Sequence, residues 1–82
     1  MFIGQVTDMS KLFFVKNNFN ADISYWDTSN VISMYMMFNG VSSFNQNLTF
    51  WCVPLINLEP FGFAILSPLN ISEMKPKWGN CF

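Results

Sequence analysis

The sequence repeats itself at an interval of 25 residues, and this repeat constrains the fold more than any other feature. Residues 6–26 align without a gap with residues 31–51. Most matched positions hold apolar or aromatic residues of the same kind. The matched pairs are Val6/Val31, Met9/Met34, Leu12/Met37, Phe13/Phe38, Phe19/Phe44, Asn20/Asn45, Ile23/Leu48 and Trp26/Trp51. Repeats of this length indicate units that stack on one another, because one unit cannot bury its own apolar face.

A third unit begins at residue 56 and then departs from the pattern. Ile56 and Phe63 continue it, whereas Glu59 falls at a methionine position and is followed by Pro60, which disrupts a helix interior. An atypical end unit is expected where a stack of repeats closes. We therefore expect a single unit over residues 1–82, divided into repeat 1 at 6–30, repeat 2 at 31–55, and a degenerate third coil with a C-terminal cap at 56–82.

Each repeat carries the pattern of one short helix and one short strand. In residues 31–38 the matched apolar positions fall at i, i+3, i+6 and i+7, on one face of a helix. Helix-capping residues precede this segment at 27–30, and Asn39-Gly40 follows it as a helix stop. Residues 47–51 and their equivalents 22–26 suit short strands. The sequence therefore predicts an α/β solenoid of 25-residue coils, each with a short parallel strand, a turn and a short helix, and an irregular C-terminal cap.

The repeat register also predicts contacts between successive coils. Paired strands place matched side chains roughly 5 Å apart, so we expect one core in which three aromatic pairs touch: Trp26/Trp51, Phe19/Phe44 and Phe13/Phe38. Asn20 and Asn45 stand before each strand. Their amides are expected to form a ladder that satisfies turn backbone groups, and the alternative is that they face a ligand.

The composition suits a module that its neighbours cover. Hydrophobic residues make up 51% of the chain and charged residues only 11%, the opposite of a disordered segment. The four lysines are scattered, so nucleic-acid binding has no electrostatic support. No apolar run approaches the ~20 residues that cross a bilayer. The first residues lack the features of a signal peptide, so the chain is either intracellular or part of a longer protein with neighbouring coils.

Catalytic chemistry has no visible basis in this sequence. There is no histidine, the commonest general base. Asp22 and Asp27 flank one predicted strand, and surface positions in the coil explain them better than a catalytic pair. Two cysteines without histidine cannot complete a zinc shell, and the glycines form no phosphate loop. We therefore expect no enzyme activity, no cofactor and no metal site.

The repeat resembles a known family of surface proteins. The pattern V-x-x-M-x-x-[LM]-F, then F-N-x-[DN]-[IL]-[ST]-x-W, with D-T-S-N-V between units, covers roughly Val6 to Val53. It is similar to the repeat of BspA-type leucine-rich-repeat surface proteins, also called the mycoplasma-lipoprotein-type domain of unknown function. The resemblance implies a leucine-rich-repeat-like solenoid, a secreted or surface location, and adhesion or recognition without a known ligand. Phe14-Val15-Lys16 departs from the more usual glycine-containing loop.

The chain has two cysteines, and both the family resemblance and their positions bear on whether they pair. Cys52 follows the last repeat tryptophan and Cys81 is the penultimate residue. We expect a disulfide that fixes the tail, with Ile56, Phe61, Phe63 and Trp78 covering the last coil. The alternative is two unpaired buried cysteines in a cytosolic protein. A disulfide implies an oxidising compartment, hence an extracellular or cell-surface location.

The expected function is a non-catalytic module that recognises a protein or glycan, and the alternative is a purely structural spacer or stalk of a larger surface protein. The candidate partner-binding surface consists of Tyr25 and Phe50, which differ between the repeats, and of Met36, which lies off the core face of its segment. Large aromatic residues commonly anchor partners, and the alternative is that Tyr25 and Phe50 pack on the coil surface or on the cap. Met34 and Met37 are assigned to the core. Two sequences, at Asn47 and Asn70, match the glycosylation acceptor pattern, which short Asn- and Ser-rich chains produce by chance.

Overall fold

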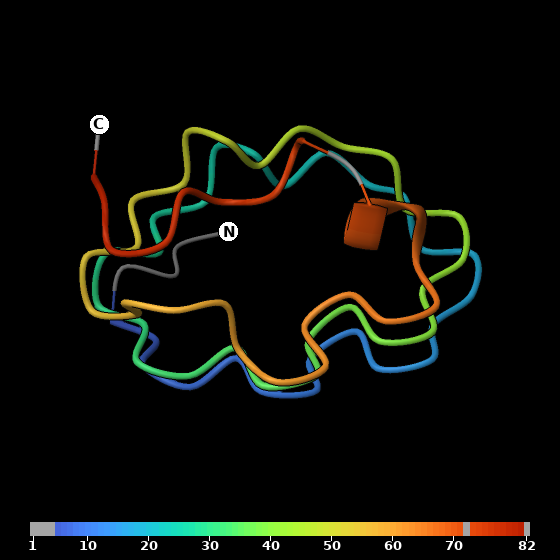
Figure 1. Ribbon diagram of the computed structural model, residues 1–82, viewed down its shortest axis with the longest axis horizontal. Helices are drawn as coiled ribbons and strands as arrows, with labels where there is room; N and C mark the ends of the chain where they lie inside the picture. The colour runs from blue at the N-terminus through green and yellow to red at the C-terminus, as the bar shows by residue number, and fades with distance from the viewer. Residues whose placement is uncertain (1–4, 72, 82) are drawn as a thin grey trace.

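The chain runs three times around a flattened ring, each circuit lying on the one before (Figure 1). The computed structural model describes residues 5–71 and 73–81. We call the circuits the first layer (residues 6–30), the second layer (31–55) and the third layer (56–81). The described chain measures 26 × 24 × 18 Å along its principal axes.

The layers are built from turns and extended segments rather than from helices and sheets. Within the described residues the only helix is η1, a 3-10 helix at Pro68–Ile71, and the only strand pairing is one isolated parallel bridge between Asp8 and Ser33. The predicted helix at 31–38 and the predicted strands at 22–26 and 47–51 are absent. The expectation of a leucine-rich-repeat-like α/β solenoid is therefore wrong.

Left-handed residues explain why the apolar pattern does not produce a helix. An α-helix needs φ near −63° at every residue, and each layer instead places two residues with positive φ four positions apart. These residues are Lys11 (φ 58°) and Val15 (51°), Met36 (53°) and Gly40 (77°), and Gly62 (66°) and Leu66 (65°). The helical spacing of the apolar residues thus comes from a repeated double turn. Val15 adopts the same conformation as Gly40, although it replaces the usual glycine.

Along the double turns, backbone hydrogen bonds join each layer to the next in one direction, because N–H groups of the first layer donate to carbonyls of the second, and N–H groups of the second layer donate to carbonyls of the third. Elsewhere the direction is reversed, since the N–H groups of Ile32 and Ser43 donate to the first-layer carbonyls of Thr7 (2.7 Å) and Asn17 (3.1 Å). The bonds along the double turns are Met9→Ser33 (2.9 Å), Lys11→Tyr35 (2.8 Å), Phe13→Met37 (3.1 Å), Val15→Asn39 (2.8 Å), Met36→Phe61 (3.1 Å), Phe38→Phe63 (2.8 Å) and Gly40→Ile65 (2.8 Å). Only alternate residues take part, because the residues between them bond within their own turn, as Met37 does to Met34 (3.2 Å).

The third layer is displaced by one residue relative to the sequence repeat. Lys11 donates to a residue 24 positions later, whereas Met36 donates to Phe61, 25 positions later. The left-handed residues show the same shift, since Met36 corresponds to Gly62. Phe63 consequently occupies the position equivalent to Met37, not the position of Phe38 that a constant 25-residue offset assigns to it. The chain bends at Leu58, ahead of Pro60, where the extra residue is accommodated.

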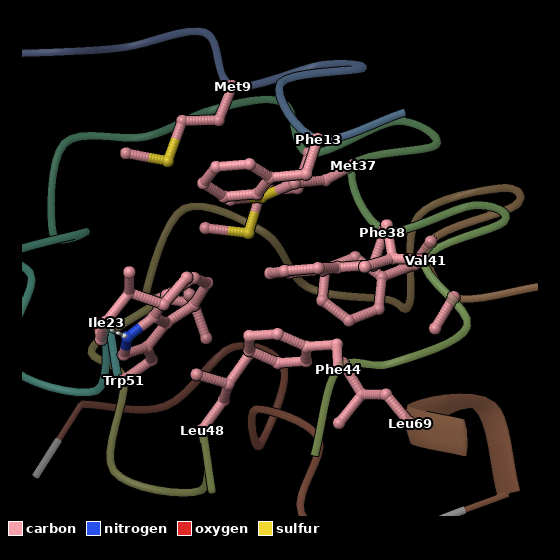
Figure 2. Packing of buried hydrophobic residues seen from close by; sticks show 14 of the residues in the cluster. Met9, Phe13, Ile23, Met37, Phe38, Val41, Phe44, Leu48, Trp51 and Leu69 are labelled. Carbon is pink, nitrogen blue, oxygen red and sulfur yellow. Dashed lines mark hydrogen bonds between the residues drawn. The ribbon is translucent and has the colours of Figure 1, made fainter. Parts of the chain in front are cut away.

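The core fills the interior of the layers with stacked apolar side chains (Figure 2). Two of the predicted aromatic pairs are confirmed, with ring centroids 5.5 Å apart for Phe13/Phe38 and 5.7 Å for Phe19/Phe44. The third predicted pair differs, since no ring contact joins Trp26 to Trp51 among the described residues. Each tryptophan instead contacts a phenylalanine of its own layer, with Trp26 5.9 Å from Phe13 and Trp51 6.4 Å from Phe38. Met34 and Met37 are fully buried, as expected.

Polar side chains add bonds between the first and second layers. The Asn20 side-chain oxygen accepts the N–H of Asn45 at 2.7 Å, so the predicted asparagine contact is present, although both residues are exposed rather than buried. The Trp51 indole N–H donates to the carbonyl of Ile23 at 3.0 Å. The fully buried Thr28 hydroxyl donates to the carbonyl of Cys52 at 2.7 Å. The bonds of Trp51 and Thr28 satisfy polar groups that burial would otherwise penalise.

Candidate functional site

Tyr25 and Phe50 are large aromatic side chains at the same position of successive layers. They are 69% and 75% exposed. Both belong to short turns, at 24–25 and 49–50, on the side of the ring opposite the double turns (Figure 1). In each layer the next residue is a tryptophan, Trp26 or Trp51, which packs against the core. The chain changes direction at this turn, so the aromatic residue before each tryptophan faces solvent. The two exposed aromatic residues thus form the centre of the predicted partner-binding surface.

Met36, the third residue of the predicted partner-binding surface, lies in another part of the layer. It is half-buried in the double turn of the second layer, across the ring from the segments that carry Tyr25 and Phe50. Its Cγ lies 2.9 Å from where a Cβ on Gly62 would stand, so the methionine packs directly against the backbone of the third layer. Met36 thus supports the contact between the second and third layers, and its part in partner binding stays a prediction.

A second exposed aromatic surface lies on the double turns and is not visible in the 25-residue alignment. Tyr35 stacks on Phe61 of the third layer, with ring centroids 5.8 Å apart, and Lys11 Nζ lies 5.9 Å from the Tyr35 ring. We call Lys11, Tyr35 and Phe61 the surface column. Phe61 is 71% exposed, so its predicted place over the last coil is wrong. The one-residue shift of the third layer hides the match between Tyr35 and Phe61, which an offset of 26 would have found.

Three aspartates form identical exposed turns. In each one the carboxylate accepts the hydroxyl and the backbone N–H of the serine two residues later, as Asp22 does from Ser24 at 2.7 and 3.0 Å. Asp8 with Ser10 and Asp27 with Ser29 repeat this arrangement. The serine hydroxyl first, and then the serine N–H, lower the pKa of each carboxyl. These groups are engaged in turn formation, which matches the expected role of Asp22 and Asp27 as surface positions.

The amide of Asn47 takes the same role at the position equivalent to Asp22. Its side-chain oxygen accepts the hydroxyl and N–H of Thr49 at 2.7 and 2.9 Å. No cluster of three metal-ligating side chains occurs among the described residues. The described chain also has no pocket.

A disulfide joins Cys52 and Cys81, whose Cα atoms are 4.0 Å apart. Beside it, the N–H of Val53 donates to the carbonyl of Asn80 at 2.8 Å, so the end of the third layer is fixed to the end of the second by two kinds of bond. Trp78 packs edge-on against Phe63 at 4.9 Å and covers the core there. Ile56 and Phe63 are buried, as expected for the tail.

Stacked 25-residue units with repeated turns, contacts and exposed positions define a repeat protein. The chain belongs to the family described as "Mycoplasma protein of unknown function, DUF285", which it matches over residues 3–59. The match covers both complete repeats and the start of the third layer. No curated protein and no solved structure matches the chain. No helix in the described part of the chain has the length and apolar character to cross a membrane.

Proposed function

We propose that the chain is a non-catalytic recognition module of a secreted or cell-surface protein, and that it binds a protein or glycan through Tyr25 and Phe50. The observation that carries this proposal is the exposure of two large aromatic side chains at one position of successive layers. Removing such side chains from water is favourable, so a bound partner that covers them would gain stability. Repeat proteins build binding surfaces from equivalent positions on neighbouring units, and aromatic residues dominate the energy of many interfaces.

Two further observations support the location and the absence of catalysis. The Cys52–Cys81 disulfide suits an oxidising compartment, and the resemblance to BspA-type surface repeats points the same way. The carboxylates of Asp8, Asp22 and Asp27 accept hydrogen bonds within their own turns. The sequence also has no histidine to act as a general base.

The experiment is a binding screen of the purified chain on glycan arrays and on arrays of extracellular host proteins. We expect a specific ligand whose signal is lost when Tyr25→Ser and Phe50→Ser are combined. Leu58→Ser is the matched control, because Leu58 is an equally exposed apolar residue (81%) in the third layer. A ligand that binds the double variant as well as the wild type would contradict the proposed site. Absence of any specific ligand would favour the spacer function, which the continuous bonding between layers also suits.

A further inference from the structure

The four turns that begin at Asp8, Asp22, Asp27 and Asn47 share one local sequence pattern. Each consists of Asp or Asn, any residue, and Ser or Thr, and in each the first side chain accepts the hydroxyl and the backbone N–H of the third residue. Three of these turns present a carboxylate. The fourth, Asn47-Leu48-Thr49, presents a carboxamide, so it alone of the four matches the acceptor pattern for N-linked glycosylation.

The Asn47 turn holds an amide nitrogen at the rim of the second layer. Asn47 is exposed although its layer has a neighbouring layer on each side. Its Oδ1 accepts both hydrogen bonds from Thr49, whereas its Nδ2 donates to no other described residue. Leu48 anchors the turn, because its side chain is fully buried and its N–H donates to the carbonyl of Met74 at 2.8 Å. The nitrogen that would carry a sugar is therefore presented to solvent from a fixed position.

The second match to the acceptor pattern lies in a different setting. Asn70 is half-buried within η1, Pro68–Ile71, where its N–H donates to the carbonyl of Ser67 at 2.9 Å. The serine that completes this pattern, Ser72, lies outside the described residues. An exposed asparagine in contact with the hydroxyl two residues later is therefore seen in the described structure at Asn47 alone.

We propose that Asn47 is an acceptor site for N-linked glycosylation. The donor is an oligosaccharide carried on a polyprenyl diphosphate. Asn47 Nδ2 forms a bond to the anomeric carbon of the sugar, and the bond between that carbon and the diphosphate oxygen breaks. The polyprenyl diphosphate leaves with the bonding electrons, and the amide nitrogen loses one proton to a base of the transferase.

The turn suits this modification both before and after folding. Its hydrogen bonds join residues only two positions apart, so it can form in the nascent chain before the layers stack. After folding, a bulky and polar sugar at the exposed Asn47 displaces no buried side chain. The proposal rests on the secreted location proposed above, and it does not depend on binding by Tyr25 and Phe50.

An exchange between two equivalent turns tests the proposal. Asn47→Asp removes the amide and copies the turn that Asp22 forms with Ser24 in the first layer. Asp22→Asn, added to Asn47→Asp, places the amide in the first-layer turn instead. Each substitution introduces a residue that the other layer already accommodates at that position, so both variants should keep the fold. Urea unfolding followed by tryptophan fluorescence checks that they do.

The whole chain is expressed behind a secretion signal in eukaryotic cells, and the secreted protein is analysed by mass spectrometry. Enzymatic removal of N-linked glycans in heavy-oxygen water labels each position that carried one. The wild type should be labelled at Asn47, Asn47→Asp should lose that label, and the double variant should gain one at position 22. A wild type that is secreted with its disulfide intact but without a glycan at Asn47 would overturn this proposal alone and leave the proposed function standing. A double variant without a glycan at position 22 would overturn the role assigned to the turn.

Discussion

Replacing Gly40 by alanine tests the close approach between the left-handed turns of neighbouring layers. Gly40 has φ 77°, and a Cβ there would stand 3.0 Å from Val15 Cγ1 and 3.4 Å from Val15 Cα. Gly79 has nearly the same φ, 80°, but the nearest atom to its Cβ would be Asn57 Oδ1 at 3.6 Å, an ordinary contact. The two glycines thus share a backbone conformation and differ in the space available for a methyl group.

The difference between the two substitutions isolates the contact between layers. A left-handed conformation costs an L-residue about 1–2 kcal/mol, and replacing glycine returns about 0.4–1 kcal/mol through the unfolded chain. Gly79→Ala should therefore lower the free energy of unfolding by about 1 kcal/mol. Gly40→Ala adds overpacking against Val15, which typically costs about 1–3 kcal/mol. The lower value applies because Val15 is more than half exposed and can shift. We expect a total of about 2 kcal/mol for Gly40→Ala.

A Val15→Gly background removes the side chain that the new methyl group meets. In this background Gly40→Ala should cost about as much as Gly79→Ala, which corresponds to a coupling of about 1 kcal/mol between residues 15 and 40. The assay is urea unfolding of the oxidised protein, followed by tryptophan fluorescence, for the four members of the cycle and for Gly79→Ala. If Gly40→Ala costs the same with valine and with glycine at position 15, the close contact between layers does not determine the penalty and the reasoning fails.

Three further outcomes follow from the contacts between and within layers. Replacing both Cys52 and Cys81 by alanine should lower the free energy of unfolding by about 3–4 kcal/mol, because the disulfide closes a loop across a separation of 29 residues and so reduces the entropy of the unfolded chain. A denaturant titration that finds no loss of stability would contradict a stabilising role for the disulfide. Thr28→Val removes the buried donor to the Cys52 carbonyl and should cost about 1–3 kcal/mol, while Thr28→Ser should largely preserve stability in the same assay. Because hydrogen bonds from serine lower the folded-state pKa of Asp8, Asp22 and Asp27, their contribution is present above the unfolded pKa and is lost as pH falls through the folded pKa. Asp22→Asn, which copies the Asn47 turn, should therefore reduce the acid sensitivity of unfolding and leave neutral stability nearly unchanged, and an unaltered acid transition would refute that assignment.

The repeat register could be obtained from the sequence because it depends on burial alone. Phe13, Phe38, Phe19 and Phe44 recur at 25-residue spacing, and their stacking requires only that successive units present the same face to one core. The type of local structure could not be obtained in this way. Apolar residues at i, i+3, i+6 and i+7 fit a short helix, and they fit equally a double turn with two left-handed residues. Lys11, Val15 and Met36 have no strong preference for positive φ, so the stacked neighbours impose that conformation.

The exposed aromatic residues were only partly predictable for a related reason. Tyr25 and Phe50 were expected outside because they differ between the repeats, and both are exposed. The packing of Met36 against Gly62 depends on the double turn, which the apolar pattern did not reveal. Phe61 was misplaced because one extra residue shifts the third layer. A single insertion inside a repeat reverses which side chains face the core while leaving the composition of the segment unchanged.

The disulfide also determines how the molecule would bear tension. Cys52 ends the second layer and Cys81 closes the third, so the covalent path between the chain ends crosses from one cysteine to the other without passing through residues 53–80. A pulling force applied at the two ends would be carried by the first two layers and then by the sulfur–sulfur bond. Under load the first two layers could extend, whereas the third would remain a slack, closed loop whose contacts with Phe38 and Met36 are lost only when the second layer leaves it.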